Sequence, residues 1–234
     1  NEMMPRMAWT LEDIVGKEAG EEGARYLAVI YADANRAGHL LLQAENEQQV
    51  QAFSNWLWTV VEESVGETAQ QLGLEGKYQS PVVGGDDVLL FVPASRALEA
   101  LKSIHKKLAS KLSKVPSQLS STKLGTCLKD LSFSYALLIA PPHLPIPFLY
   151  QYAQALLKSS KQLAYQLRDP RDVIDFQWIT ESSPLSESLQ DLRRVFHCKP
   201  QDGRRFLQDG KSFSIDEYWT TAKPYGWEEF NELL

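Results

Sequence analysis

The stretch that most constrains this fold is YQSPVVGGDDVLLFVPA, residues 78–94. Two apolar, β-branched runs meet there at Gly84-Gly85-Asp86-Asp87. Glycine supplies the positive φ angles that two-residue hairpin loops require, so the stretch predicts a tight β-hairpin. Its tip carries two adjacent carboxylates, which repel each other unless a cation lies close to both. The pair therefore indicates a divalent metal bound through oxygen ligands.

Patterns on either side of the hairpin predict the other elements. Strands are expected where residues are apolar and β-branched, and helices where apolar residues recur every three or four positions. The polar, broken stretch 113–130 indicates a loop, and Ser95 is the expected N-cap of the helix after the hairpin. We expect strands at 25–33, 131–140 and 172–180, and helices within 38–72, at 95–108, at 149–167 and, as short pieces, at 186–194 and 227–234.

The order of these elements is strand, helix, hairpin, helix, strand, helix, strand. It predicts an α+β fold of the ferredoxin-like βαββαβ type, with an antiparallel sheet, helices on one face and a C-terminal extension. In that fold the first strand is a central neighbour of the hairpin. Asp33, at the end of the first strand, is therefore expected beside Asp86 and Asp87.

Composition narrows the class of protein. The net charge of −6 gives no overall basic surface for gripping duplex nucleic acid, although it leaves a local basic groove open. Cys127 and Cys198 are not in metal-ligand spacing, which fits a reducing intracellular setting. No apolar run is long enough for a membrane span and no secretion signal is apparent, so we expect a cytoplasmic protein without a membrane partner. The absence of GxGxxG and GxxxxGK[ST] argues against Rossmann and P-loop nucleotide binding.

Three stretches carry a resemblance to a known family. They are YLAVIYADANRAGHLL, the GGDD hairpin, and LSFSYALLIAPPHLPIPFLYQYAQALLKSSK, and they occur in the expected order. The chain resembles the GGDD palm domain of the large, polymerase-like subunit of type III CRISPR effector complexes and, more distantly, GGDEF-type nucleotide cyclases. The resemblance implies a lead-in at 1–24, a palm at 25–180 and an extension at 181–234 that packs on the palm.

The family implies a metal-dependent nucleotidyltransferase that converts nucleoside triphosphates, with ATP favoured, into a cyclic or oligonucleotide signal in antiviral defence. Carried over to this chain, Asp33 and Asp86 become metal ligands, and Asp87 a second ligand or a catalytic carboxylate. The implied cofactor is Mg²⁺ or Mn²⁺. Lys161 would contact triphosphate oxygens, as a mobile point charge can.

The resemblance also assigns nucleotide contacts to residues around the hairpin. Gly84 and Gly85 would let the backbone approach the nucleotide closely, because neither has a Cβ. Asn35 stands where the family often has an acidic residue, which removes one negative charge, although an amide oxygen still binds hard cations. Ala34 would offer a backbone carbonyl to a metal.

The family also implies partners. Its subunits contain a further palm that this sequence lacks, so we expect a homodimer or a partner palm to complete the site, within a larger effector complex. A second hypothesis is a palm with reduced catalysis that senses nucleotides or supports assembly, as Asn35 and the acidic composition suggest. A template-dependent polymerase is disfavoured, because no basic template channel is evident.

Structural explanations of the same residues remain open. Asp86 and Asp87 would also suit a solvated turn, and Asp33 the polar end of a strand. Lys158 and Lys161 would suit the solvent face of an amphipathic helix. The four histidines show no ligand spacing, which favours structural roles for them.

Overall fold

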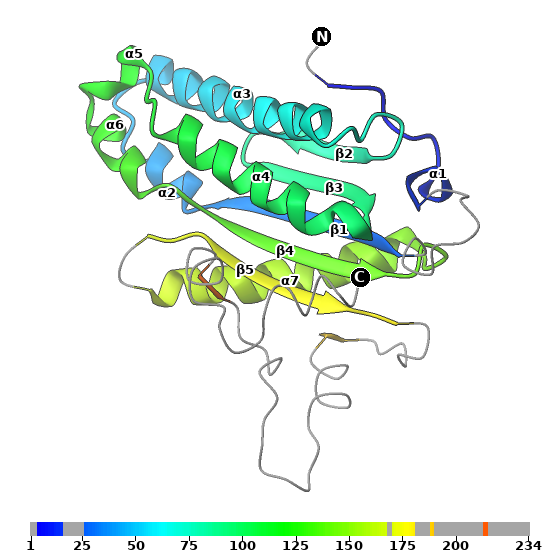
Figure 1. The fold of residues 1–234 in the computed structure, drawn as a ribbon. Coiled ribbons are helices and arrows are strands. Elements are labelled where there is room, and N and C mark those ends of the chain that lie inside the picture. Colours follow the sequence, from blue (N-terminus) through cyan, green and yellow to red (C-terminus); the bar gives the residue numbers. More distant parts are fainter. Residues whose placement is uncertain (1–3, 16–25, 168–169, 181–187, 190–212, 215–234) are drawn as a thin grey trace, which may run out of the picture.

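A six-stranded sheet with the strand order β2-β3-β1-β4-β5-β6 forms the centre of the molecule (Figure 1). The computed structural model describes residues 4–15, 26–167, 170–180, 188–189 and 213–214. The strands are β1 (Leu27–Asn35), β2 (Gln79–Gly84), β3 (Asp87–Pro93), β4 (Ser132–Ala140), β5 (Val173–Trp178) and β6 (Phe213–Ser214). The helices are α1 (Leu11–Val15), α2 (Ala37–Leu41), α3 (Glu47–Gln71), α4 (Ala94–Leu112), α5 (Ser117–Ser120), α6 (Lys123–Cys127), the 3₁₀ helix η2 (Leu128–Asp130) and α7 (Ile146–Gln166).

The ferredoxin-like α+β fold is confirmed. Strand β1 lies between β3 and β4 and is antiparallel to both, and β2 and β3 form the predicted hairpin. Strand β5 differs from the expected all-antiparallel sheet, because it pairs in parallel with β4. The crossover through α7 explains this direction, since a helix that links two neighbouring strands returns the chain to the same end of the sheet.

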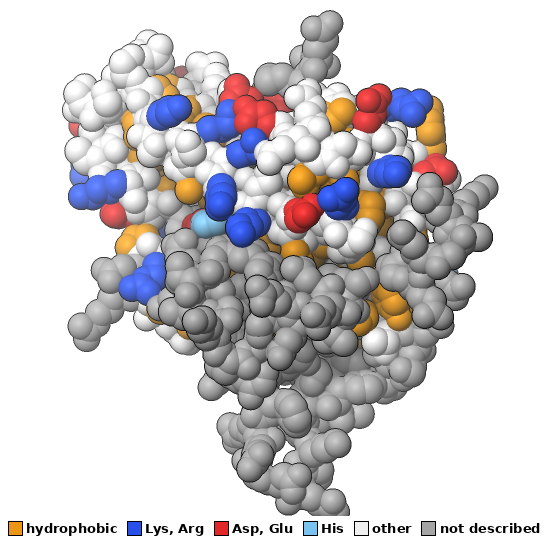
Figure 2. All heavy atoms as spheres, in the orientation of Figure 1, with side chains coloured by type: hydrophobic (Ala, Val, Ile, Leu, Met, Phe, Trp, Pro, Cys, Tyr) orange, Lys and Arg blue, Asp and Glu red, His pale blue; other side chains and the backbone are white. Residues whose placement is uncertain are grey.

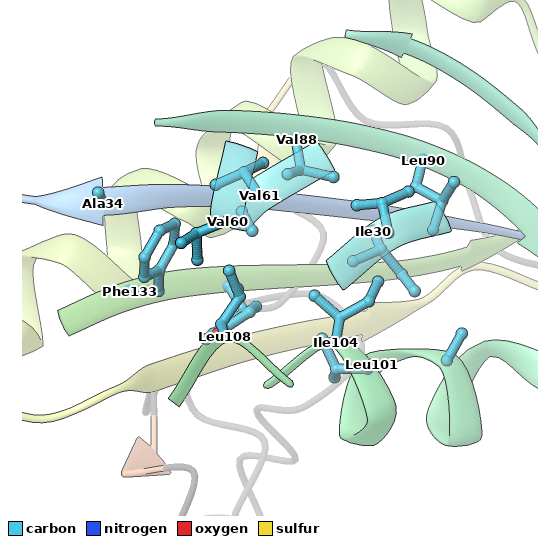
Figure 3. Packing of buried hydrophobic residues seen from close by; sticks show 14 of the residues in the cluster. Ile30, Ala34, Val60, Val61, Val88, Leu90, Leu101, Ile104, Leu108 and Phe133 are labelled. Atoms are coloured by element: carbon cyan, nitrogen blue, oxygen red, sulfur yellow. The ribbon is translucent and has the colours of Figure 1, made fainter. Parts of the chain in front are cut away.

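Helices cover both faces of the sheet, so the expectation of helices on one face was wrong. Helices α3 and α4 pack on one face against β1 residues such as Ile30, whereas α7 and α1 pack on the other against residues such as Val29. All nine residues of β4 are buried, as a strand between two helical layers requires. Figure 3 shows the first layer, in which Val61 of α3 and Ile104 of α4 approach Ile30 and Leu90 of the sheet.

A side-chain cap explains where helix α3 begins. Asn46 caps α3 by accepting a hydrogen bond from the backbone N–H of Gln49 at 3.0 Å. Helix α4 begins at Ala94 after Pro93, so Ser95 lies inside the helix and is not its N-cap. The expected loop at 113–130 instead contains three short helical elements, α5, α6 and η2. The exposed serines and threonines of this stretch concealed that tendency, because such residues favour turns as strongly as helix starts.

The lead-in is partly tied to the palm. Ala8 donates its backbone N–H to the carbonyl of Tyr78 at 2.7 Å, and Ile14 of α1 is buried on the α7 face of the sheet. In the C-terminal extension, the described residues include β6, which pairs with β5. The short helices expected near 186–194 and 227–234 lie outside the described residues, apart from Ser188 and Leu189. Within the described part of the chain, no helix has the length and apolar character needed to cross a membrane.

Candidate functional site

The tip of the hairpin brings two of the predicted carboxylates together. Asp33 of β1 lies directly opposite Asp87 of β3 in the antiparallel register. Gly85 and Asp86 form the two-residue loop, since Gly84 pairs with Asp87, and Gly85 has φ +63°. The backbone N–H of Ala34 donates to the carbonyl of Asp86 at 3.1 Å, which holds the tip against the end of β1.

The two carboxylates lie on the face of the sheet that α7 covers. Side chains alternate along a strand, so Asp33 shares a face with Val29 and Tyr31, both of which pack in the α7 layer. Asp87 likewise shares a face with Leu89 and Phe91 of the same layer. The site therefore lies between the hairpin tip and α7.

Burial and the neighbouring acid make Asp87 unusually basic. Burial, a hydrogen bond with Asp33 and the charges of Asp33 and Asp86 together raise the pKa of Asp87 to about 7. Lys161 opposes this shift. Asp87 Oδ1 is buried and has no hydrogen-bond partner within the described structure. The positive charge near Asp33 and Asp87 is therefore too small to keep both carboxylates fully ionised.

Lys161 of α7 is the cation that reaches this pair. Its Nζ donates a hydrogen bond to Asp33 Oδ1, and the two side chains are 25% and 18% exposed. The structure thus brings Lys161 together with Asp33 and Asp87, whereas the contact expected from the resemblance, with triphosphate oxygens, stays a prediction. Because the ion pair is only partly exposed, water screens it less than a surface pair.

A pocket of about 360 Å³ lies next to the ion pair along α7. Tyr31 and Lys161 line it and also border the carboxylates. The rest of its lining comes from the same stripe of α7, at Gln154, Leu157, Lys158, Gln162 and Tyr165. The guanidinium of Arg36 lies 5.5 Å from the centre of the Tyr165 ring at one end of the pocket.

Tyr150 joins two residues of the pocket lining, Tyr31 and Gln154. Tyr31 stacks on Tyr150 with ring centres 5.8 Å apart, and Gln154 Nε2 donates to the Tyr150 hydroxyl at 2.8 Å. Burial, the hydrogen bond to Tyr150 and the charge of Asp87 raise the pKa of Tyr31, so its phenol stays neutral. Tyr31, Tyr150 and Gln154 were not among the site residues predicted from the sequence. A usable signal was present, because Tyr31 precedes Asp33 by two positions on one strand face.

Asn35 has a different environment from the one expected for a nucleotide contact. Its side-chain Nδ2 donates to Ser132 Oγ at 3.0 Å, and its Oδ1 accepts from Ser134 Oγ at 2.7 Å. Asn35 is only 3% exposed. Both ends of the amide are thus bound to neighbouring β4 hydroxyls, and the residue joins β1 to β4.

The remaining predicted residues occupy the hairpin itself. Asp86 lies in the loop and is half-buried, and Gly85 needs its positive φ to form that loop. A Cβ added at Gly84 would lie 3.8 Å from Trp58 Nε1, an ordinary contact, so space alone does not require glycine there.

A divalent metal fits the chemistry of the tip in part. Asp33 and Asp87 offer adjacent carboxylate oxygens, one of them without a partner, and hard cations prefer such ligands. Across the described residues, however, no group of three or more His, Cys, Asp or Glu side chains is arranged to hold a metal ion. Asp33, Asp86 and Asp87 therefore do not form such a group together.

A family model gives the identity of the domain. The model for Cas10/Cmr2, second palm domain, matches residues 26–169, which is more than half of the chain. The chain belongs to this family. The match covers β1, the GGDD hairpin, β4 and α7, and so includes the whole of the site described above. The suspected relationship to the CRISPR palm is therefore confirmed. A search of curated proteins found no match.

Two solved cassette structures support the same fold, and a GGDEF domain is also similar. A Csm1–Csm4 cassette in complex with AMPPNP aligns with a TM-score of 0.51 at 14% identity, covering 69% of this chain and 22% of that one. The cassette in complex with cA4 gives a TM-score of 0.51 at 13% identity, with the same coverage of 69% and 22%. The GGDEF domain of DgcB from Caulobacter crescentus, in complex with c-di-GMP, aligns at a TM-score of 0.42 and 16% identity, covering 65% and 79%. The Cas10-type palm thus spans about a fifth of the cassette chains that it matches.

Proposed function

We propose that this palm is a metal-dependent nucleotidyltransferase that joins nucleoside triphosphates, with ATP favoured, into a cyclic or oligonucleotide signal for CRISPR-type antiviral defence. The observation that carries the proposal is the direct pairing of Asp33 with Asp87 beside Lys161, which also lines a pocket of about 360 Å³. Paired carboxylates, a cation and a pocket are the parts that phosphoryl transfer needs, because its catalysis depends mainly on positioning and on charge neutralisation.

Each residue has a role in this proposal. Asp33 and Asp87 would hold Mg²⁺ or Mn²⁺, which would supply activation of the attacking hydroxyl and charge neutralisation at the leaving pyrophosphate. Asp86 lies close enough to act on Asp87 through its charge and is the third acidic candidate. Lys161 exchanges its bond to Asp33 for the triphosphate oxygens. Gly84 and Gly85 leave the hairpin backbone open to the nucleotide.

The relatives favour a nucleotide substrate and a larger assembly. The Csm1–Csm4 cassettes were solved in complex with AMPPNP and with cA4, and Csm4 is part of each complex. By analogy, ATP is the favoured substrate here and an effector complex the favoured setting. Because this palm offers two converging carboxylates, we propose that a second palm, from a homodimer or a partner protein, completes the site.

A second candidate function is nucleotide sensing or assembly by a palm with reduced catalysis. Two observations favour it: Asn35 is bound to Ser132 and Ser134, and the described residues contain no three-ligand metal cluster. This palm would bind a nucleotide through Lys161 and the pocket without turning it over.

Incubation with each radiolabelled nucleoside triphosphate and Mg²⁺ or Mn²⁺ separates the two functions. The synthase predicts pyrophosphate release and a product that is lost in the Asp33→Asn and Asp87→Asn variants. Nucleotide binding without any product, in the presence of a partner palm, would support the sensing function and contradict the first proposal. Light scattering with ATP and metal tests the homodimer, and a strictly monomeric species would leave the partner protein as the source of the second palm.

A further inference from the structure

Basic residues are concentrated in one segment of this acidic chain. Residues 94–130 contain eight lysines and arginines and two acidic residues, a local charge of 8 − 2 = +6, whereas the whole chain has a net charge of −6. The basic residues are Arg96, Lys102, Lys106, Lys107, Lys111, Lys114, Lys123 and Lys129. Such asymmetry indicates a surface with its own partner rather than a uniformly solvated exterior.

The fold places this segment away from the candidate active site. Helix α4 packs on the sheet face opposite α7, and α5, α6 and η2 follow it in the chain. Figure 2 shows lysine and arginine side chains spread over this side of the molecule, with acidic side chains among them. We call the exposed surface of α4, α5, α6 and η2 the basic face.

Part of this charge is already neutralised within the protein. Lys111 pairs with Glu63 and Glu67 of α3 at 2.6 and 2.8 Å, and Lys107 pairs with Glu67 at 3.4 Å. Arg96 pairs with Glu99 at 2.8 Å. Four exposed lysines on this face have no ion pair within the described structure: Lys106, Lys114, Lys123 and Lys129.

The chemistry of the basic face favours phosphate groups over a protein partner. None of the large hydrophobic residues that are exposed in the described structure falls within residues 94–130. A stable protein interface needs an apolar core, which this face therefore lacks. Hydroxyl side chains, which hydrogen-bond phosphates, are exposed between the lysines instead; they include Ser95, Ser110, Ser113, Ser117, Ser120, Ser121 and Thr126.

We propose that the basic face binds the phosphodiester backbone of a single-stranded nucleic acid. A flexible strand suits the lysines better than a rigid duplex, because they come from α4, the loop after it, α6 and η2 without a regular spacing. This inference does not depend on the proposed catalytic function, since it involves a different face of the sheet.

Counterion release gives the binding a measurable signature. Each phosphate that a lysine neutralises on a single strand contributes about −0.7 to the slope of log K against log salt. Four lysines therefore predict a slope of about −3, which corresponds to roughly 50-fold weaker binding when salt rises from about 50 to 200 mM. The contacts are non-specific in sequence, because the backbone carries the charge.

Fluorescence anisotropy with a labelled, unstructured single-stranded RNA and the corresponding DNA tests the proposal on the full chain. The quadruple variant Lys106→Gln, Lys114→Gln, Lys123→Gln, Lys129→Gln should abolish the salt-dependent binding, and each single replacement should reduce the slope by about 0.7. Because all four side chains are exposed, circular dichroism should show an unchanged fold.

A charge-matched control separates this face from general electrostatics. Arg6→Gln, Lys77→Glu and Gln151→Glu together also lower the net charge by four (1 + 2 + 1), at exposed positions outside residues 94–130. This control should bind RNA and DNA as the parent does. The proposal is overturned if the quadruple variant and the control weaken binding equally. It is also overturned if a duplex or polyglutamate binds more tightly than the single strands, or if the parent does not bind at low salt.

Discussion

Asp33 of β1 and Asp87 of β3 lie directly opposite each other on central strands, and Lys161 reaches only the first of them through a hydrogen bond. Placing two carboxylates side by side in a core sheet costs folding free energy, because burial and mutual repulsion both disfavour their charged forms. The Cas10-type palm keeps this pair at the point where the hairpin, β1 and α7 meet. The cost suggests that the pair serves a bound cation rather than stability.

The first prediction concerns stability against pH. The pKa of Asp87 is about 7 in the folded protein, above its ordinary value of 3.8, so the folded state binds more protons than the unfolded state between these values. Stability is therefore greatest in the acid part of that window and falls as pH rises through it. We expect the melting temperature of Asp87→Asn to exceed that of the parent at about pH 8 and to vary less with pH. If the melting temperature of the parent rises relative to that of Asp87→Asn between about pH 5 and pH 8, the raised pKa of Asp87 is contradicted.

The second prediction concerns the metal. At a pH above 7, Mg²⁺ or Mn²⁺ should raise the melting temperature of the parent, because a ligand of the folded state at about 100 times its Kd stabilises by about 2.7 kcal/mol. Asp33→Asn and Asp87→Asn should each remove most of this shift. Asp86→Asn should keep most of it, since Asp86 lies in the hairpin loop, outside the Asp33–Asp87 register pair. Differential scanning fluorimetry with and without the metal measures this shift for the parent and the three variants. A loss of the shift in Asp86→Asn as large as in the other two variants would make Asp86 a full ligand.

The third prediction concerns Lys161. Lys161→Met should weaken binding of a non-hydrolysable ATP analogue by about tenfold or more, since a charge-assisted hydrogen bond contributes roughly 1.5–3 kcal/mol. Lys158→Met removes a neighbouring exposed lysine of the same pocket and is the matched control, with a smaller expected effect. Isothermal titration gives both affinities. Unchanged binding in Lys161→Met would reduce this lysine to a counter-ion of Asp33.

The fourth prediction separates structure from binding at Asn35. Asn35→Ala leaves the buried hydroxyls of Ser132 and Ser134 without their amide partner, so unfolding free energy should fall by about 1–3 kcal/mol. Asn55→Ala, at an exposed position of α3, should change stability by less than about 0.5 kcal/mol. Denaturant melts measure both. If Asn35→Ala instead keeps its stability and loses nucleotide affinity, then the amide is a ligand contact after all.

Much of the fold could be predicted because its local signals agree with one another. The hairpin was predictable from Gly84 and Gly85 between two β-branched runs, and α7 from the regular spacing of its apolar residues. The order of these elements was enough to predict that β1 lies beside the hairpin, which the strand order confirms. That order in turn placed Asp33 beside the hairpin, although the sequence alone could not distinguish Asp86 from Asp87 as its partner.

Features that depend on contacts between residues far apart in the sequence could not be predicted in this way. Helices on the second face follow from the burial of β4 on both sides, and a short apolar run does not reveal how many layers cover it. The environment of Asn35 depends on two serines almost a hundred positions along the chain, at Ser132 and Ser134. No local pattern near Asn35 records that contact.

The sequence by itself determined the elements, their order and the acidic hairpin, because backbone preferences and side-chain periodicity act over a few residues. Only the tertiary structure decided which carboxylates pair, that Lys161 reaches Asp33, and that Tyr31 joins the wall of the pocket. These relations depend on strand register and on where α7 crosses the sheet. Register is set by the packing of both faces together, since a shift of one residue would exchange every buried side chain of a strand with its neighbours.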